Sequence, residues 1–312
     1  PMNEDGSETL YSFEVKEPIV NFGVSVVSES ARALIDPFVL GSKDENDVEG
    51  YAGIPTDVNS LTYDSGLDVG AAGVQFPRLQ RFYVAVDSRA DEFTNRSQKG
   101  KYVLRTWVDD LVGPQVRILT TRVTAGRPLI AAEVVDSQSG VDPLSLVINY
   151  SGALVGASAY DPVSGLVLFG IPTNAPAFKA GKRTLTLQAS DYQEAKNINT
   201  VGDAIYPNST FADKKITVVK GPTVSWLSPP ASVCALKTEQ LVVTGGATRK
   251  IRRVEFTLDG KRLGVDKKGA AGIYSLAWKT GKVAKGKHVL AARLTDASGK
   301  TASSARKIRV CK

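Results

Sequence analysis

The chain has 312 residues, a length that suits two or three domains because single hydrophobic cores stop growing well below it. Hydrophobic residues make up 42% of it and charged residues 23%, which excludes a mainly disordered polypeptide. Abundant Val and Thr, with 28 Gly, 15 Pro and a single Met, favour strands and turns, so we expect an all-β protein. No apolar run approaches the roughly 18 residues of a membrane helix, so we expect no membrane insertion.

The net charge of +7 is the sum of an acidic N-terminal part and a basic C-terminal part of the chain. Residues 1–112 contain 10 Lys+Arg and 19 Asp+Glu, a net charge of −9, whereas residues 221–312 contain 19 and 5, a net charge of +14. A module this basic attracts cell-wall or other polyanionic polymers, while the alternative is a Lys-rich surface that serves only solubility.

Residues 1–112 predict a first β domain. Alternating apolar residues favour strands at 10–15, 21–27, 82–86 and 102–108, and the Gly-, Asp- and Asn-rich stretch 41–73 is expected to be mostly loop. This loop carries the densest carboxylate cluster of the chain, which makes Ca²⁺ a possible ligand although no cofactor is required. The cluster lacks the glycine and the final glutamate of an EF-hand loop, so a solvated acidic loop is the alternative. Its residues are Asp44, Glu45, Asp47 and Glu49.

An internal repeat organises the remainder of the chain. The segment 113–116 (GPQV) recurs as 221–224 (GPTV), and the apolar positions of 146–156 recur at the same offset of 108 in 254–264. We therefore expect domains at 1–112, 113–220 and 221–312, the last two being tandem copies of one sandwich. The middle copy has two apparent loop insertions, 160–176 and 197–212, where a specific ligand could bind. Asp136, Ser139 and Asp142 form a weaker Ca²⁺ candidate at an interdomain joint.

Seven strands are predicted in the last domain. They span 222–228, 240–244, 251–258, 262–266, 273–279, 287–295 and 302–310, a number typical of a sandwich. Asp259-Gly260 supplies a tight hairpin turn, and Asp296 with Gly299 closes the next one. Cys234 and Cys311 lie near the two ends of this domain, so we expect a disulfide and hence an oxidising compartment, with two free thiols of a cytosolic protein as the alternative.

Basic side chains bracket one predicted hairpin of the last domain, where strand alternation places several of them toward solvent. Contact with a polyanion is predicted there, but not specific nucleic-acid recognition, because the segment lacks exposed aromatic residues for stacking. The residues are Arg249, Lys250, Arg252, Arg253, Lys261, Arg262, Lys267 and Lys268.

Catalytic motifs do not assemble from this sequence. The only histidine, His288, shares strand parity with the apolar positions Leu290 and Leu294, which favours a packed or edge-bonded side chain over a general base. No Gly-x-Ser-x-Gly motif occurs, and one histidine with two cysteines does not complete a zinc site or a Cys–His dyad. We therefore predict that this chain is not an enzyme, and that it is a monomer.

The last domain resembles the bacterial immunoglobulin-like domains. The resemblance rests on residues 222–229 (PTVSWLSP), 254–260 (VEFTLDG) and 286–299 (GKHVLAARLTDASG), and the middle domain is a looser version. It implies immunoglobulin-like sandwiches that serve as spacer and binding modules in secreted and wall-attached proteins. Residues 81–88 (RFYVAVDS) and 100–107 (GKYVLRTW) resemble the jelly-roll-like C-terminal sandwich of secreted subtilisin-like serine proteases.

These observations lead to one functional hypothesis and two alternatives. The hypothesis is a non-catalytic C-terminal accessory region of a secreted bacterial protein, a subtilisin-like serine protease (peptidase S8), that positions the parent enzyme and contacts a surface or its protein substrate. The first alternative is a cell-surface adhesin or matrix-binding segment. The second is a carbohydrate-binding or hydrolytic protein, for which an exposed Trp107 would be the best evidence. Each of the three has an extracellular location, secreted or at the cell surface.

Overall fold

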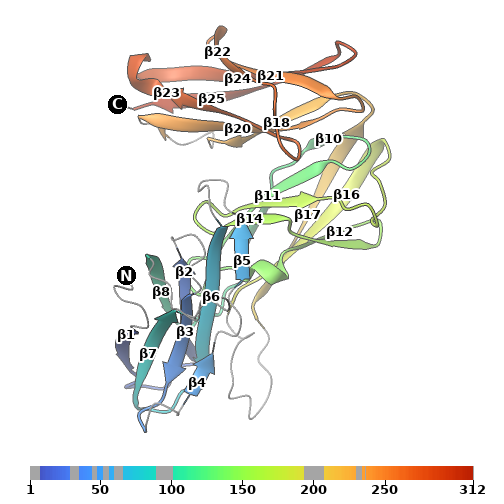
Figure 1. The fold of residues 1–312 in the computed structure, drawn as a ribbon. Helices are drawn as coiled ribbons and strands as arrows, with labels where there is room; N and C mark the ends of the chain where they lie inside the picture. The colour runs from blue at the N-terminus through green and yellow to red at the C-terminus, as the bar shows by residue number, and fades with distance from the viewer. Residues whose placement is uncertain are drawn as a thin grey trace, which may run out of the picture.

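The computed structural model describes residues 8–28, 35–43, 48–51, 56–59, 66–88, 101–192, 207–229, 234–235 and 237–311. Within these ranges the chain forms 25 β-strands and two single-turn 3₁₀ helices, so the expected all-β class is confirmed. The strands build three two-layered sandwiches that follow one another along a bent arm, with the middle sandwich at the bend (Figure 1). Among the described residues there is no helix of the length and apolarity that crossing a membrane requires.

The first sandwich is jelly-roll-like and packs two four-stranded sheets against each other. Its alternating apolar residues meet in a core that includes Phe22, Val26, Val39 and Phe82. One sheet has the order β1 (Thr9–Glu14), β7 (Arg81–Ser88), β3 (Ile35–Leu40) and β4 (Val48–Tyr51). The other has the order β5 (Thr56–Asn59), β6 (Gly66–Gln75), β2 (Asn21–Ser28) and β8 (Tyr102–Val108).

The expectation of a mostly loop stretch at 41–73 is wrong in part. This stretch contains β4, β5 and most of β6, and β6 pairs with β2 over seven residues. Glycine and alanine have low strand propensity, and Gly70, Ala71, Ala72 and Gly73 concealed the strand. Ala71 of this segment lies in the same core cluster as Trp107. A Cβ added to Gly23 of the neighbouring β2 would meet the Trp107 ring at 2.2 Å.

The middle sandwich has a five-stranded and a four-stranded sheet around a core rich in Ile, Leu and Phe. The five-stranded sheet has the order β10 (Arg122–Thr124), β17 (Ser209–Val219), β16 (Gly181–Ser190), β12 (Val147–Tyr150) and β13 (Ala153–Gly156). The four-stranded sheet has the order β14 (Ala159–Asp161), β15 (Leu166–Gly170), β11 (Leu129–Val135) and β9 (Gln115–Ile118). The helix η1 (Pro143–Ser145) precedes β12.

The predicted loop insertion at 160–176 is therefore wrong in its first part, which contains part of β14 and all of β15. Val167, Leu168 and Phe169 of β15 are consecutive buried residues, a pattern without the alternation that marks a strand with one solvent face. Most of the second insertion lies outside the described residues, and the part from Ser209 onward belongs to β17.

The last sandwich pairs a three-stranded with a five-stranded sheet, and all seven predicted strands are present. The three-stranded sheet has the order β18 (Thr223–Ser228), β20 (Thr238–Gly246) and β23 (Ile273–Lys279). The five-stranded sheet has the order β19 (Cys234–Ala235), β25 (Thr301–Val310), β24 (Gly286–Asp296), β21 (Ile251–Leu258) and β22 (Lys261–Asp266). The helix η2 (Thr280–Lys282) follows β23.

The five-stranded sheets of the middle and last sandwiches have equivalent strand orders. In each sheet the first strand of the order, β10 or β19, runs parallel to its neighbour, and the remaining pairs are antiparallel. This equivalence accords with the repeat in the sequence. That the two sandwiches are copies of one family stays a prediction.

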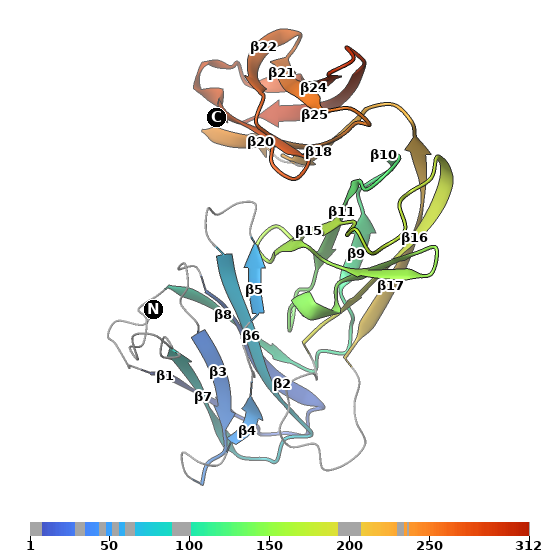
Figure 2. The same ribbon diagram turned by 45° about the vertical axis from the view of Figure 1, so that its right-hand side comes forward.

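The sandwiches are joined by buried contacts as well as by the chain. Trp107 of β8 and Ala71 of β6 belong to the hydrophobic core cluster of the middle sandwich, so the first joint is apolar in part. At the second joint, Leu227 and Val242 of the last sandwich pack against Ala131 and Leu168 of the middle one. Figure 2 shows both joints from a second direction, with β18 and β20 next to the middle sandwich.

Candidate functional site

The two sheets of the last sandwich face different surroundings. The outer face of β18 and β20 is covered, because Leu227 and Val242 pack against the middle sandwich. The five-stranded sheet lies on the far side, at the end of the arm (Figure 1). Its inner face supplies the core residues Phe256, Leu290 and Ile308. Its outer face is therefore the free surface of this domain.

The register of the strands arranges the side chains of the outer face in rows that cross β25, β24, β21 and β22. Arg293 lies between Ser303 and Glu255, and Lys307 lies opposite Val289. Arg309 lies opposite Lys287 in the last row. Partners in one row share a face of the sheet, so the rows bring together basic side chains that are far apart in the sequence. This outer basic face comprises Arg253, Arg262, Lys287, Arg293, Lys307 and Arg309, all of them exposed.

Short side chains occupy the centre of the outer basic face. Ala305, Ala291 and Thr257 form one row that ends at Arg262 on the edge strand β22. Ser303 precedes this row on β25. Because these side chains are short and the surrounding ones are long, the centre is a shallow floor edged by ammonium and guanidinium groups. Within the described residues, Glu255 is the acidic side chain inside this face, and the exposed Asp259 lies at its end, opposite Val289.

The eight basic residues predicted from the sequence are all exposed, but they do not form one group. Only Arg253 and Arg262 lie on the outer basic face. Lys261 lies at the tip of the hairpin between β21 and β22. The other five lie at the opposite end of that hairpin, where Arg252 occupies an irregularity in the pairing with β24. We call this group the hairpin end: Arg249, Lys250, Arg252, Lys267 and Lys268.

Sequence reasoning missed Lys287, Arg293, Lys307 and Arg309. These lie on β24 and β25, outside the hairpin to which the prediction was confined. Alternation within 301–310 was the available signal, since residues at odd positions are exposed and Ile308 and Val310 are buried. Antiparallel pairing of β24 with β25 then completes the face, and no local pattern encodes that pairing.

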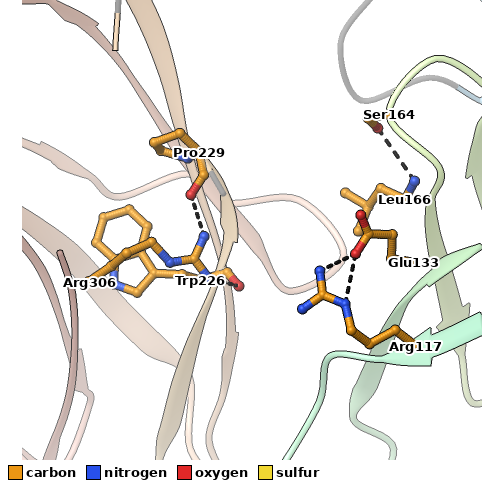
Figure 3. Close-up of polar contacts among 7 residues, drawn as sticks. All are labelled: Arg117, Glu133, Ser164, Leu166, Trp226, Pro229 and Arg306. Carbon is orange, nitrogen blue, oxygen red and sulfur yellow. Dashed lines mark hydrogen bonds and ion pairs between the residues drawn. The ribbon is translucent and has the colours of Figure 1, made fainter. Parts of the chain in front are cut away.

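Arg306 is not part of the outer basic face, because its side chain lies on the inner face of β25. The guanidinium of Arg306 lies 5.9 Å from the centre of the Trp226 ring and donates hydrogen bonds to the carbonyl groups of Trp226 and Pro229 (Figure 3). Burial, and secondarily the charge of Arg117 across the joint, lowers the pKa of Arg306. Arg117 itself pairs with Glu133 (Figure 3). Arg306 is thus a structural residue that connects β25 to the end of β18 within the last sandwich.

None of the six basic side chains of the outer face makes a hydrogen bond or ion pair with any residue in the described ranges. Exposed charges that lack internal partners are available to an external anion. What the arrangement offers chemically is therefore electrostatic contact with an extended polyanion.

The single histidine is hydrogen-bonded at the end of the five-stranded sheet. Nδ1 of His288 lies 2.7 Å from Oδ2 of Asp259, and Nε2 lies 2.9 Å from the carbonyl oxygen of Ala284. Both contacts raise the pKa of His288, the bond to Asp259 being the larger cause. The bond to His288 in turn lowers the pKa of Asp259. The prediction of an edge-bonded histidine agrees with this geometry.

The predicted disulfide is confirmed. Cys234 of β19 is bonded to Cys311, directly after β25, and their Cα atoms are 5.4 Å apart. The bond closes a segment of 77 residues that contains every strand of the five-stranded sheet. It therefore fixes the edge strand β19 to the strand that contributes Lys307 and Arg309 to the outer basic face.

The structure provides no exposed tryptophan. Trp107, Trp226 and Trp278 are 4%, 5% and 4% exposed, so none of them offers a stacking platform to a sugar. Trp107, the residue whose exposure would have supported carbohydrate binding, is buried because it packs into the core cluster of the middle sandwich. The carbohydrate-binding alternative loses the residue on which it depended.

An aspartate cluster lies at the first joint. Carboxylate oxygens of Asp110, Asp136 and Asp191 lie within 4.8 Å of one another, and Asp110 and Asp191 are fully buried. Burial raises the pKa of Asp136, and the charge of Asp110 acts in the same direction against the opposing amides of Gly140 and Gln138. Asn208 donates a side-chain hydrogen bond of 2.6 Å to Asp191. The cluster therefore ties the interdomain connection to two loops of the middle sandwich.

Only one of the residues predicted to bind Ca²⁺ belongs to this aspartate cluster. Asp136 belongs to it and the amide of Ser139 donates to Asp110, but Asp142 instead accepts from the amide of Leu144 and caps η1. Oxygen ligands of this kind suit Ca²⁺, yet acidic groups alone do not define a metal site. Asp44, Glu45 and Asp47 lie outside the described residues, as does the side chain of Glu49 on β4.

A shallow groove of about 390 Å³ runs beside the free edge strand β13 of the middle sandwich. Leu154, Pro172, Asn174 and Pro176 are among its lining residues, and no charged side chain lines it. Arg127 holds the far wall by donating to the carbonyl groups of Pro172, Thr173 and Ala175. One side of the groove, from Gly170 to Pro176, belongs to the first predicted insertion, but the groove is open and nothing marks its occupant.

A known family model matches one part of this chain, and solved structures resemble it distantly. None of the curated protein sequences compared with the chain matches it. Solved structures with similar chain folds include fibronectin(III)-like modules of Clostridium thermocellum CbhA (18% identity, TM-score 0.26, 63% of this chain and 94% of that one). Another is dimeric latent PorU from Porphyromonas gingivalis (15% identity, TM-score 0.37, 97% of this chain and 31% of that one).

A third is the surface glycan-binding protein SGBP-B of Bacteroides ovatus, solved with a mixed-linkage heptasaccharide (12% identity, TM-score 0.29, 89% of this chain and 60% of that one). Likenesses this distant carry no argument about function. The family match is confined to the last sandwich, where residues 222–292 match the model of the bacterial Ig domain.

Proposed function

We propose that this chain is a non-catalytic accessory region of an extracellular bacterial protein, which presents its basic last sandwich to a polyanionic polymer such as that of a cell wall. The observation that carries the proposal is the orientation of the last sandwich. One of its sheets is fixed to the rest of the arm through Leu227 and Val242, and the other displays unpaired basic side chains to solvent. A domain held in this way positions whatever precedes it relative to a surface.

The family match and the disulfide support this proposal. Bacterial Ig domains serve as spacer and binding modules, and the Cys234–Cys311 bond is suited to an oxidising compartment. A subtilisin-like serine protease is the parent that we propose, from the resemblance of residues 81–88 and 100–107. In the cell-surface adhesin alternative the same arm anchors a binding surface rather than an enzyme.

Retention of the full chain on insoluble cell-wall polymer across a salt series tests the proposal. Binding at low ionic strength that declines as salt is added is expected, because exposed charges are screened over about 10 Å at 0.1 M salt. A charge-reversed variant carrying Arg252→Glu, Arg253→Glu, Lys261→Glu and Arg262→Glu should bind more weakly. Absence of binding at low salt would refute the polyanion-binding role.

A further inference from the structure

We propose that the outer basic face is a binding site for a linear acidic polysaccharide, whose chain lies along the strands over the floor of short side chains. This inference rests on the proposed polyanion-binding function and names its place and its ligand. The site is the face formed by β21, β22, β24 and β25, to which Arg253 and Arg262 of the predicted set belong, and it excludes the hairpin end.

Charge complementarity is the first argument for this ligand. On the described part of the face, six basic side chains surround one acidic side chain, Glu255, with Asp259 at the end of the face, and none of the six basic side chains has a partner there. Successive rows are about 7 Å apart, because strands rise about 3.4 Å per residue and every second residue faces outward. Each of five successive rows contains at least one basic side chain: Arg253, then Arg293, then Arg262, then Lys307, then Lys287 with Arg309. An extended polymer with repeated carboxylates would contact a basic side chain in each row along its length.

The floor is the second argument. Ala291 and Ala305 leave the backbone of β24 and β25 accessible, while Ser303 and Thr257 offer hydroxyl groups that donate and accept hydrogen bonds. A polysaccharide presents hydroxyl groups to such a floor and carboxylates to the surrounding cations. A nucleic acid fits less well, since single-strand binders stack bases on aromatic side chains and the face has none.

The test compares three forms of the full chain for binding to immobilised polygalacturonate at low ionic strength. The face variant carries Arg262→Ser, Arg293→Ser, Lys307→Ser and Arg309→Ser. The end variant carries Arg249→Ser, Lys250→Ser, Lys267→Ser and Lys268→Ser, and it loses the same charge from exposed positions outside the face. Thermal unfolding of each form checks that the fold is retained.

We expect the face variant to bind at least about tenfold more weakly and the end variant to bind nearly as well as the wild type, because exposed charge contacts act locally. Ala305→Ile, which raises the floor without changing charge, should also weaken binding several-fold. Two other polymers serve as competitors: a neutral dextran at the same mass concentration should not compete with immobilised polygalacturonate, and a soluble polyphosphate at the same charge concentration should compete less strongly than free polygalacturonate.

The outcomes separate this inference from the function on which it rests. Equal losses in the face and end variants would overturn the inference and leave general polyanion binding intact. Stronger competition by polyphosphate than by free polygalacturonate would overturn the choice of a carboxylate polymer. Failure of the wild type to bind any polyanion at low ionic strength would overturn both proposals.

Discussion

His288 and Asp259 are joined across the end of the five-stranded sheet by a 2.7 Å contact between Nδ1 and Oδ2. Oδ1 of Asp259 also accepts from the amide of Val289 at 2.8 Å. Asp259 has a positive φ of 47° at the hairpin tip between β21 and β22, so the pair connects this turn to β24. The contact contributes a pH-dependent element at the edge of the outer basic face.

The stabilisation from this pair should depend on pH in a defined direction. The folded-state pKa of His288 is raised above 6.5, mainly by Asp259, so its contribution is complete below pH 6.5 and is lost as pH rises through the raised pKa. The pKa of Asp259 is lowered from 3.8, mainly by His288, so its contribution is present above pH 3.8 and is lost as pH falls through the lowered value. Both contributions are complete between these two limits.

Thermal unfolding of wild type and His288→Gln from pH 4 to pH 9 measures this dependence. The difference in Tm should be largest near pH 5 to 6 and should shrink above the pKa of His288. In Asp259→Asn, which tolerates the positive φ, the pKa of His288 measured by NMR should fall toward its ordinary value. A Tm difference that is the same at pH 5.5 and pH 9 would contradict the assignment.

The Cys234–Cys311 bond should supply a large share of the stability of the last sandwich. In the chain-entropy model, closing a 77-residue segment stabilises a domain by about 4 kcal/mol. The double variant Cys234→Ser, Cys311→Ser should lose stability of this order, measured by hydrogen exchange of the β24 and β25 amides, which reports on this sandwich separately. Reduced wild type is the matched control and should resemble the variant. Unchanged exchange would show that the strands alone hold the edge.

The positions of the strands could be predicted from the sequence better than the outer basic face could. Apolar and polar residues alternate through most of residues 251–258 and 273–279, and both predicted ranges equal the observed strands. Alternation did not reveal β6, which is rich in Gly and Ala. It did not reveal β15 either, because three consecutive residues of that strand are buried. The outer basic face and the joints depend on pairing between distant strands and on packing between domains, which local sequence patterns do not encode. Asp191 illustrates this limit, since the side chain that donates to it belongs to Asn208, 17 residues further along the chain.

Close packing behind Trp107 should make Gly23 intolerant of substitution. A Cβ at position 23 would lie 2.2 Å from Cζ2 of Trp107 and 2.6 Å from the backbone oxygen of Ala72. Because the backbone oxygen has little room to move, Gly23→Ala should cost about 1 to 3 kcal/mol, the range for overpacking in a core. Gly156→Ala on β13 is the matched control, since nothing lies within 4 Å of its added Cβ. Urea unfolding of both variants measures the difference, and equal midpoints would contradict the packing at the first joint.

The second joint should depend on two apolar side chains of the last sandwich. Leu227 and Val242 are 7% and 6% exposed, and they pack with Ala131 and Leu168 rather than within the core of their own domain. Leu227→Ser removes apolar contact area from the joint, a loss of about 1 to 3 kcal/mol for a buried leucine, while it leaves that core intact.

The last sandwich should then move more freely relative to the middle one. Small-angle X-ray scattering should show a larger radius of gyration and a wider distance distribution for Leu227→Ser than for the wild type. Leu154→Ser is the control, because Leu154 is 72% exposed and lies away from both joints on the edge strand β13. Identical scattering from the wild type and Leu227→Ser would mean that the interdomain segment alone fixes the direction of the arm. The outer basic face would then owe its orientation to the chain between β17 and β18 rather than to the packed joint.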